Sequence, residues 1–381
     1  MVESAVIVGA GIGGLACATA LARRGVAVTV FERAPAIRDV GAGLQISPNG
    51  LAVLRALGLE AVLDAQGAVQ ATSVVLSDYK AGREVARLDL TRLGDQRYLF
   101  VHRHDLVTVL AQAAKAAGVT LRLGQAVASV VPGDAPHILL GDGAQAQADV
   151  AICADGLHSV GRQVVSPGAE ARFTGQVAWR ATVPAQGALA QARVSMGPGR
   201  HVVSYPLRGG SMMNLVAVQE RDSWAEEGWH HEDDPAHLRA AFADFGGPVA
   251  ELLSELKQVS LWGLFRHPVA ECWMRDNVAL LGDAAHPTLP FLAQGANLAL
   301  EDAWVLAECL VAGEPERYQA LRRDRAGKVI DAASGNAWKY HLRPGVVRTF
   351  AHLGLSLGSR VAPGMMMRQF DWIYRHDVTA R

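Results

Sequence analysis

The sequence predicts an α/β fold in which a discontinuous parallel-sheet domain is interleaved with a second, β-rich domain and followed by a helical region. Three observations lead to this prediction. Half of the 381 residues are hydrophobic, the first 32 residues have a strand-helix-strand pattern, and β-rich runs broken by Gly and Pro follow in the middle of the chain. A chain of this size buries a large core and favours two domains over one.

The N-terminal pattern is a βαβ unit. Residues 5–8 are fully apolar, as expected for a central strand of a parallel sheet that is covered on both faces. Residues 15–24 are rich in Ala and Leu and predict a helix, and residues 26–31 predict a second strand.

The remaining elements follow from periodicity and from Gly and Pro. Residues 104–117 predict a helix, residues 83–90 and 179–218 predict the strands of the second domain, and the chain is helical from residue 318, with interruptions at Pro344 and Pro363. Short strands at 119–123, 126–131 and 138–140 return to the first domain. The predicted division is 1–71, 98–177 and 265–335 for the first domain, 72–97 and 178–264 for the second, and 336–381 for the helical segment.

Charge and composition exclude several classes of partner. The formal charge is −1, from 36 Lys and Arg against 37 Asp and Glu, so no basic field attracts nucleic acid or an anionic membrane. Residues 5–22 are uncharged and long enough for a membrane span, but four glycines argue against one. Glu3 stands where a signal peptide has positive charge. We expect neither membrane nor nucleic acid as a partner.

The cysteines indicate a reducing compartment. Cys17, Cys153, Cys272 and Cys309 are far apart and form no CxxC pair and no metal-type spacing with His. We therefore expect a cytoplasmic protein with no metal site and no redox-active disulfide.

A glycine motif links the first strand to the first helix. Residues 9–14 read Gly-Ala-Gly-Ile-Gly-Gly and satisfy G-x-G-x-x-G. Such glycines form a tight turn, let backbone amides approach a pyrophosphate, and allow close packing of helix on strand. Glu32 ends the second strand, where its carboxylate can bind both ribose hydroxyls of an adenosine. The expected dinucleotide-binding residues here are Gly9, Gly11, Gly13, Gly14, Glu32 and Arg33, and the motif alone leaves both FAD and NAD possible.

The segment 277–302 identifies a family. It reads Asn-Val-Ala-Leu-Leu-Gly-Asp-Ala-Ala-His-Pro over 277–287 and Ala-Gln-Gly-Ala-Asn over 293–297, with Glu301-Asp302 after it. This resembles the Gly-Asp segment of the class A flavoprotein aromatic hydroxylases, which include 3-hydroxybenzoate 6-hydroxylases and salicylate hydroxylases. The resemblance implies that Gly282 and Asp283 bind the ribityl and pyrophosphate part of FAD. It also implies that a helix beginning near Gly295, Ala296 and Asn297 points its positive end at the flavin, where negative charge collects on reduction.

Further motifs of this family occur in the same order. Asp155-Gly156 within residues 152–162 resembles the motif associated with FAD and NAD(P)H, although Gly161 departs from the usual small aliphatic residue. Residues 41–50, with Gly43, and Arg103 match two further positions at the FAD. The resemblance covers residues 5 to about 310, and loosely 371–374. It implies a Rossmann-like FAD-binding domain of the glutathione-reductase type with a β-sheet substrate domain.

Residues 199–210 are similar to the segment of 3-hydroxybenzoate 6-hydroxylases that has a His and a Tyr four residues apart. On a strand, residues four apart point to one face, so His201 and Tyr205 can line one wall of a pocket. Histidine is suited to take a phenol proton, which makes these two residues the expected catalytic groups. The alternative is that His201 is a buried strand residue hydrogen-bonded to a neighbour.

The expected pocket lining differs from that of the relatives. Pro290 stands where 3-hydroxybenzoate 6-hydroxylases have Gln, and Gln45 stands where hydroxynicotinate enzymes have His. The sequence therefore does not determine which aromatic compound is the substrate. The residues expected to line the pocket are Gln45, Trp179, Pro290, Phe291 and Gln294.

The function implied is an FAD-dependent monooxygenase that uses NAD(P)H and O2 to hydroxylate a small phenolic aromatic acid through a flavin C4a-hydroperoxide. The alternatives are a heteroaromatic or larger phenolic substrate, and a non-catalytic FAD-binding protein. A plain NAD dehydrogenase leaves the motifs at Asp155 and Asp283 unexplained, a disulfide reductase needs CxxC, and a flavin halogenase needs W-x-W-x-I-P. We expect a monomer or homodimer, and the sequence does not distinguish NADH from NADPH.

Overall fold

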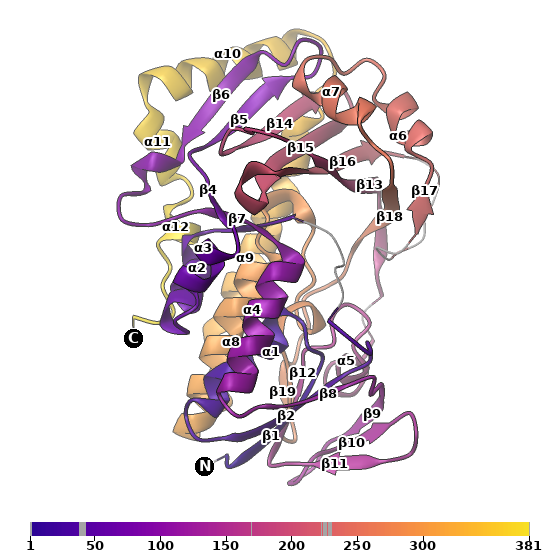
Figure 1. Cartoon of the computed structure of the whole chain (residues 1–381), viewed down its shortest axis with the longest axis vertical. Helices are drawn as coiled ribbons and strands as arrows, with labels where there is room; N and C mark the ends of the chain where they lie inside the picture. The colour runs from indigo at the N-terminus through magenta and orange to yellow at the C-terminus, as the bar shows by residue number, and fades with distance from the viewer. Residues whose placement is uncertain are drawn as a thin grey trace.

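The computed structural model describes residues 2–37, 43–168, 170–221, 223, 227 and 231–380. Two sheets form two parts that are stacked along the long axis of the molecule (Figure 1). The first two residues of the motif at 41–50 lie outside the described residues.

The first part is a six-stranded sheet in the order β19-β20-β12-β1-β2-β8. The apolar strand β1 is central and pairs in parallel with β12 and β2, as its composition predicts. All neighbours are parallel except β19, which is antiparallel to β20. The bounds are β1 Ser4–Val8, β2 Ala27–Glu32, β8 Thr120–Leu123, β12 Val150–Cys153, β19 Met274–Arg275 and β20 Val278–Leu280.

Helices cover this sheet. The glycine motif leads directly into α1, which packs against both α4 and α8. The last two predicted short strands do not join the sheet: together with a third strand they form a separate antiparallel sheet at the bottom of Figure 1. The bounds are α1 Ile12–Ala22, α4 Arg103–Ala116, α5 Val160–Val165, α8 Gly295–Ala312, β9 Val127–Val131, β10 His137–Leu140 and β11 Gln145–Gln147.

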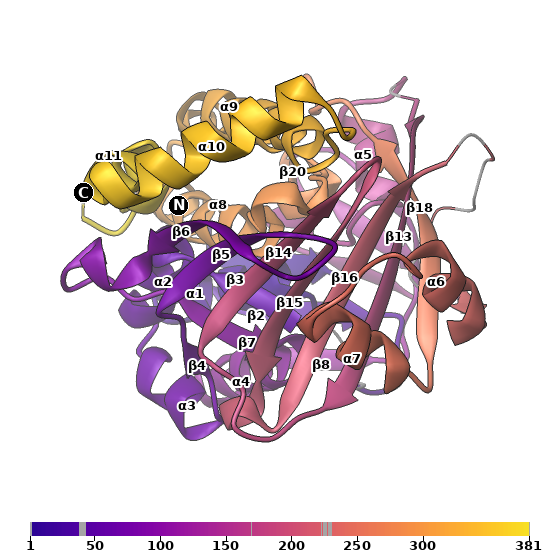
Figure 2. The same cartoon turned by 90° about the horizontal axis from the view of Figure 1, so that it is seen from above.

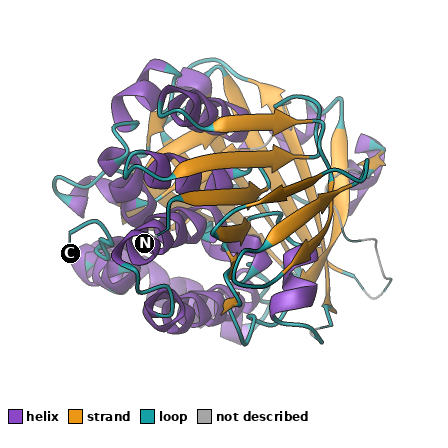
Figure 3. Ribbon diagram, turned by 90° about the horizontal axis from the view of Figure 1, so that it is seen from below, coloured by secondary structure: helices purple, strands orange, loops and turns teal. Residues whose placement is uncertain are grey.

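The second part is an eight-stranded sheet in the order β17-β18-β13-β16-β15-β14-β5-β6 (Figure 3). Neighbouring strands are antiparallel except β14 and β5. The bounds are β5 Ser73–Asp78, β6 Glu84–Asp89, β13 Arg172–Pro184, β14 Gln191–Gly197, β15 Arg200–Leu207, β16 Met212–Glu220, β17 Glu232–Asp233 and β18 Val259–Arg266.

Side chains along these strands point alternately to the two faces of the large sheet, and the two faces have different surroundings. One face packs on α6 and α7 and forms a hydrophobic core of its own, which includes Trp179, Phe242 and Phe245. The other face is turned toward the first part. The bounds of the two covering helices are α6 Pro235–Ala241 and α7 Pro248–Ser254.

A small sheet, β3-β7-β4, stands where the two parts meet. Its strand β7 contacts β15 of the large sheet, and α2 packs on α8, so this segment joins the two cores. The bounds are β3 Gly43–Ile46, β4 Val69–Gln70, β7 Leu99–His102, α2 Pro48–Ala56, α3 Glu60–Ala65 and η1 Leu90–Leu93.

The C-terminal region is helical, as predicted, and Pro344 and Pro363 mark its interruptions. It consists of α9 Arg317–Tyr340, α10 Val346–Val361, α11 Pro363–Arg368 and α12 Asp371–Tyr374. Figure 2 shows α10 on the outside of the molecule, at the edge of the large sheet, where it packs on β6. Within the described residues, no helix combines the length and the apolarity that a membrane crossing requires.

The predicted domain boundaries stay a prediction. Three elements run across them without interruption: β13 crosses 177/178, β18 crosses 264/265 and α9 crosses 335/336.

Candidate active site

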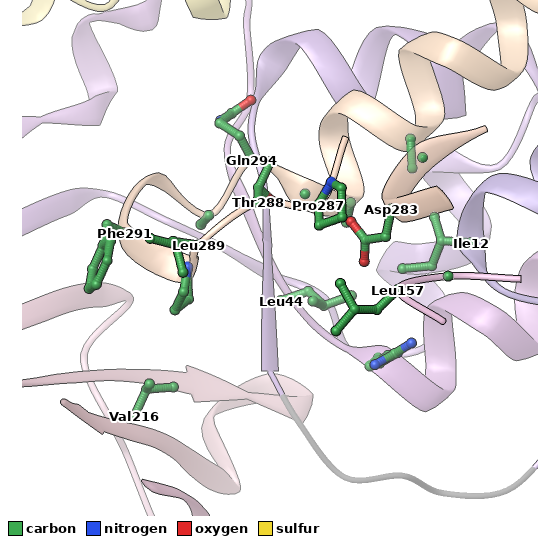
Figure 4. A pocket seen from close by; sticks show the side chains of 18 of the residues that line it. Ile12, Leu44, Leu157, Val216, Asp283, Pro287, Thr288, Leu289, Phe291 and Gln294 are labelled. Atoms are coloured by element: carbon green, nitrogen blue, oxygen red, sulfur yellow. The ribbon is translucent and has the colours of Figure 1, made fainter. Parts of the chain in front are cut away.

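A cavity of about 330 Å³ lies between the two parts of the molecule. Its walls come from the starts of α1 and α8 on one side and from β13, β15, β16 and β18 on the other. Figure 4 shows the Asp283 carboxylate turned toward Ile12 and Leu157 at one end, with Phe291 and Val216 at the other. The cavity therefore joins the expected cofactor residues to the expected substrate residues.

The four glycines of the N-terminal motif have different structural roles. A Cβ on Gly11 would meet no protein atom within 4 Å, and Gly11 lines the cavity. By contrast, a Cβ on Gly13 would come within 2.3 Å of Leu281 Cδ2, and one on Gly14 within 2.1 Å of the Gly9 carbonyl oxygen. Gly9 has a φ of +100°, which forms the turn. Gly11 leaves room for a ligand, and the other three permit the turn and the close packing.

Glu32 supports this loop from the next strand. Its carboxylate accepts hydrogen bonds from the amides of Ala10 and Ala34, both at 2.8 Å. Glu32 and the exposed Arg33 lie outside the cavity lining. Their contact with an adenosine ribose stays a prediction.

Asp155 and Gly156 stand at the end of β12. The Asp155 carboxylate accepts a hydrogen bond from the amide of Val160 at 2.8 Å and so holds the start of α5. Burial raises the pKa of Asp155, while the hydrogen bonds from Ser159 and Val160 lower it. Only Gly156 lines the cavity; its φ is +80°, and a Cβ there would meet nothing within 4 Å.

Opposite charges face the same end of the cavity. Asp283 lies in the short helix η3, Gly282–Ala284, and Arg103 is the first residue of α4. Burial raises the pKa of Asp283, and the charges of His286 and Arg103 oppose that rise. Burial lowers the pKa of Arg103, and Asp283 opposes that fall. The two groups stabilise each other's charge inside the protein.

The start of α8 reaches the cavity through Gly295 and Ala296. The first-turn amides of a helix lack intrahelical partners and carry positive partial charge. Asn297 points elsewhere: it is buried, its Oδ1 accepts from the Ser47 amide at 3.0 Å, and its Nδ2 donates to the Gln45 carbonyl at 3.0 Å. Asn297 therefore fixes the end of β3 to α8 and does not line the cavity.

Together these features fit FAD. Gly11, Gly156 and Gly295 leave backbone exposed to the cavity, two helix starts point at it, and Arg103 and Asp283 face it. A long, doubly charged dinucleotide needs such a combination of open backbone and helix termini.

The far end of the cavity is a wall of the large sheet. His201, Val203 and Tyr205 on β15 and Val216 and Val218 on β16 all face it. The predicted same-face arrangement of His201 and Tyr205 is therefore present. Burial raises the pKa of Tyr205, and the charge of Arg180 opposes this.

The expectation for Trp179 is wrong. Its side chain lies on the opposite face of β13, where Nε1 donates to Asp233 Oδ2 at 2.7 Å and the ring packs against Phe242. Arg180, the next residue, faces the cavity instead. Its guanidinium lies 5.4 Å from the ring centre of Trp262, and burial lowers its pKa only to about 10, so it is charged at neutral pH.

The other expected pocket residues lie at the cavity. Gln45 lines it and accepts a hydrogen bond from the Tyr98 hydroxyl at 2.8 Å. Pro290 and Phe291 belong to the short helix η4, Pro290–Leu292, and the Phe291 ring lies 6.0 Å from the His201 ring. Gln294 also lines the cavity and donates to Ser47 Oγ at 2.9 Å.

His201 is also hydrogen-bonded to a neighbour, as the alternative interpretation held. Its Nδ1 lies 2.7 Å from Nε2 of His341, which immediately follows α9. Burial, and then the charge of His341, lower the pKa of His201 well below its usual value, so the ring is neutral near pH 7. The residue is thus part of the buried core and of the cavity wall at once.

A buried charge cluster joins α8 to α9, and no local sequence pattern predicted it. Arg322 on α9 contacts Glu301 at 2.5 Å and Asp302 at 2.7 Å, and all three side chains are fully buried. Asp302 also pairs with His286, next to the Gly-Asp motif. Within the described residues, no group of three or more His, Cys, Asp or Glu is placed to hold a metal ion.

Comparison with known proteins shows the family of this chain. Residues 2–333 match the family model described as FAD binding domain. The 3-amino-4-hydroxybenzoate 2-monooxygenase of Streptomyces cremeus is 39% identical over 358 residues, covering 89% of this chain and 88% of the relative. The 3-hydroxybenzoate 6-hydroxylase of Klebsiella oxytoca is 31% identical over 393 residues, covering 98% and 96%.

A solved structure shows the same fold. HpxO of Klebsiella pneumoniae, complexed with FAD and uric acid, superposes with a TM-score of 0.83 at 25% identity over 95% of each chain. The chain is therefore an FAD-dependent monooxygenase, and it belongs to the class A flavoprotein aromatic hydroxylases that its motifs indicated.

Proposed function

We propose that this enzyme hydroxylates a small phenolic aromatic acid of the hydroxybenzoate or aminohydroxybenzoate class. The observation that supports this most is Arg180, a charged guanidinium in a wall that also contains Val203, Val216 and Val218. Apolar side chains suit the faces of a ring, and a guanidinium suits a carboxylate. The relatives from Streptomyces cremeus and Klebsiella oxytoca have names that give substrates of this class.

The residues of the chain then have distinct roles. FAD, when bound, supplies the redox chemistry with NAD(P)H and O2. Arg180 binds the carboxylate and Tyr205, beside it, orients the ring, while His201 accepts the proton of the phenol. The positive end of α8 stabilises negative charge on the cofactor.

The experiment compares aromatic acids with their carboxamides. NAD(P)H use, peroxide and product mass are followed for hydroxybenzoates, aminohydroxybenzoates and hydroxypyridines. We expect coupled product only from acids. We also expect Arg180→Gln to raise KM for the acid by about tenfold to hundredfold, the value of a charge-assisted hydrogen bond.

Arg193→Gln is the matched control, because Arg193 lies on β14 of the same sheet and outside this cavity. Equal turnover of amides and acids, or an unchanged KM in Arg180→Gln, would contradict the proposal. Product formed only from hydroxypyridines would establish the heteroaromatic alternative.

We further propose that the protein is a homodimer that pairs through α10. One face of this helix has large apolar side chains that are 53% to 81% exposed, namely Val346, Phe350, Leu353, Leu357 and Val361. Contiguous exposed apolar residues mark interaction surfaces.

The spacing of these residues favours a second copy as the partner. In an antiparallel pair about a twofold axis, Val346 lies opposite Val361, Phe350 opposite Leu357, and Leu353 opposite Gly354. A Cβ on Gly354 would meet no atom within 4 Å, so this position leaves space for the partner's leucine. Such a self-complementary stripe is what an isologous interface requires.

We also propose a cytoplasmic location. Cys17, Cys153, Cys272 and Cys309 form no disulfide, and three of them are buried. Free thiols are typical of a reducing compartment.

A further inference from the structure

Three side chains form a hydrogen-bonded path from the cavity to the surface. His201 lines the cavity and its Nδ1 lies 2.7 Å from His341 Nε2. On the far side, His341 Nδ1 lies 2.8 Å from Glu220 Oε1. The residues come from β15, from the end of α9 and from the end of β16, so no local sequence pattern brings them together.

The two histidines of this path are buried, and only its outer end is exposed. His201 is 2% exposed and His341 is 5% exposed, whereas the Glu220 side chain is 47% exposed. The backbone holds the path in place, because the amide of Gly199 donates to the His341 carbonyl at 3.0 Å and the amide of Glu220 donates to the Gly199 carbonyl at 2.8 Å. The inner end is therefore buried and fixed, and the outer end is exposed to solvent.

The carboxylate determines which ring nitrogen has the proton. An ionised carboxylate only accepts hydrogen bonds, so His341 donates from Nδ1. The Nε2 of neutral His341 is then an acceptor, so His201 donates from its Nδ1. The Nε2 of His201 then has a lone pair that can accept a proton from a group in the cavity.

We infer that His201, His341 and Glu220 are a proton path that exchanges the phenol proton of the substrate with solvent. This inference rests on the proposed function, since it requires a phenolic group beside His201. His341 and Glu220 act only through His201 and touch no substrate themselves.

The transfer balances as three proton shifts. The phenol O–H bond breaks and a bond forms at His201 Nε2; the Nδ1–H bond of His201 breaks and one forms at His341 Nε2. The Nδ1–H bond of His341 then breaks, Glu220 takes the proton, and water removes it. The reverse sequence returns a proton to the hydroxylated product and restores both rings to their first tautomer.

The surroundings favour outward movement. Burial, then His341, lower the pKa of His201 well below its usual value, so a proton is held poorly there. Burial also lowers the pKa of His341, but the hydrogen bond that His341 donates to Glu220 opposes this. A proton is thus held better nearer the surface.

The test uses FAD-loaded enzyme and 4-hydroxy-3-nitrobenzoate, whose absorbance reports ionisation of its phenol without turnover. Stopped-flow pH jumps give the ionisation rate of the bound probe. Glu220→Gln retains an acceptor for His341 but cannot take up a proton, and His341→Ala removes the middle of the path. Glu232→Gln, an exposed acid on the same sheet, is the control.

We expect Glu220→Gln and His341→Ala to slow ionisation by about tenfold or more, as for loss of a proton-transfer group. Free imidazole should restore the rate in His341→Ala, and Glu232→Gln should match the wild type. If Glu220 and His341 only supported the structure, Glu220→Gln would ionise the probe at the wild-type rate. That result would overturn the path, and so would a His341→Ala variant whose rate imidazole does not restore.

The experiment distinguishes failure of the proposed function from failure of the proton path. If the probe ionises through the path but no aromatic acid is hydroxylated, the substrate class is wrong and the path stands. If the nitrophenol does not bind at all, both proposals are wrong.

Discussion

Gly11 and Gly14 belong to one motif, but each leaves room for a different neighbour. Gly11 borders the cavity with open space where a Cβ would stand, and its backbone has an ordinary extended conformation, φ −77° and ψ −175°. Gly14 faces the carbonyl oxygen of Gly9. The first position therefore matters to the ligand and the second to the fold.

This contrast gives a paired prediction. Gly11→Ala should fold with a free energy of unfolding within about 0.5 kcal/mol of the wild-type apoprotein but retain less FAD, measured by flavin absorbance per chain. Gly14→Ala should lose about 1 to 3 kcal/mol by overpacking, measured by urea unfolding of the apoprotein. Identical behaviour of the two variants in both measurements would show that the motif acts as one unit.

Single residues also show the limit of sequence analysis at the site. The glycine motif could be predicted because its spacing is tied to a local turn. The expectations for Arg103, Asp283 and His201 came instead from the resemblance to the family. Trp179 was assigned to the wrong face because one residue of offset exchanges the two faces of a strand. The register of β13 against β18 shifts between Phe173 and Val177, and no local signal reveals such a shift.

Among the elements, α8 and α9 are joined by the buried cluster around Arg322. The βαβ unit and the C-terminal helices follow from periodicity, which is local. The pairing of Arg322 with Glu301 and Asp302 spans two helices, so it depends on tertiary packing and was not predicted.

Removing the cation should be costly. Arg322→Met leaves two carboxylates buried, and we expect it to lower the free energy of unfolding by about 3 to 5 kcal/mol in urea titrations. Arg317→Met on the same helix breaks an exposed pair with Glu314 and should leave the free energy of unfolding close to that of the wild type. Comparable losses in the two variants would mean that burial of the cluster adds nothing.

For the whole molecule, the dimer proposed to form through the apolar face of α10 predicts the mass of the particle in solution. The wild type should sediment at about twice its chain mass of 40.4 kDa at micromolar concentration. Leu353→Glu should be a monomer, because it places a charge at the centre of the twofold contact.

The control is Leu189→Glu, which alters another exposed leucine, 70% exposed, away from α10. This variant should keep the mass of the wild type. A wild-type protein that sediments as a monomer would establish the other expected state, and a dimeric Leu353→Glu would place the interface elsewhere.

The two faces of the large sheet also bear on how this enzyme can acquire new substrates. Val203, Val216 and Val218 line the cavity, whereas Val202, Leu215 and Ala217 between them pack in the core under α6 and α7. Changes at the first set alter the volume available to a ring without removing atoms from that core. Substrate range can therefore drift, in evolution or in a directed library, while folding stays under separate selection on the reverse side of the same strands.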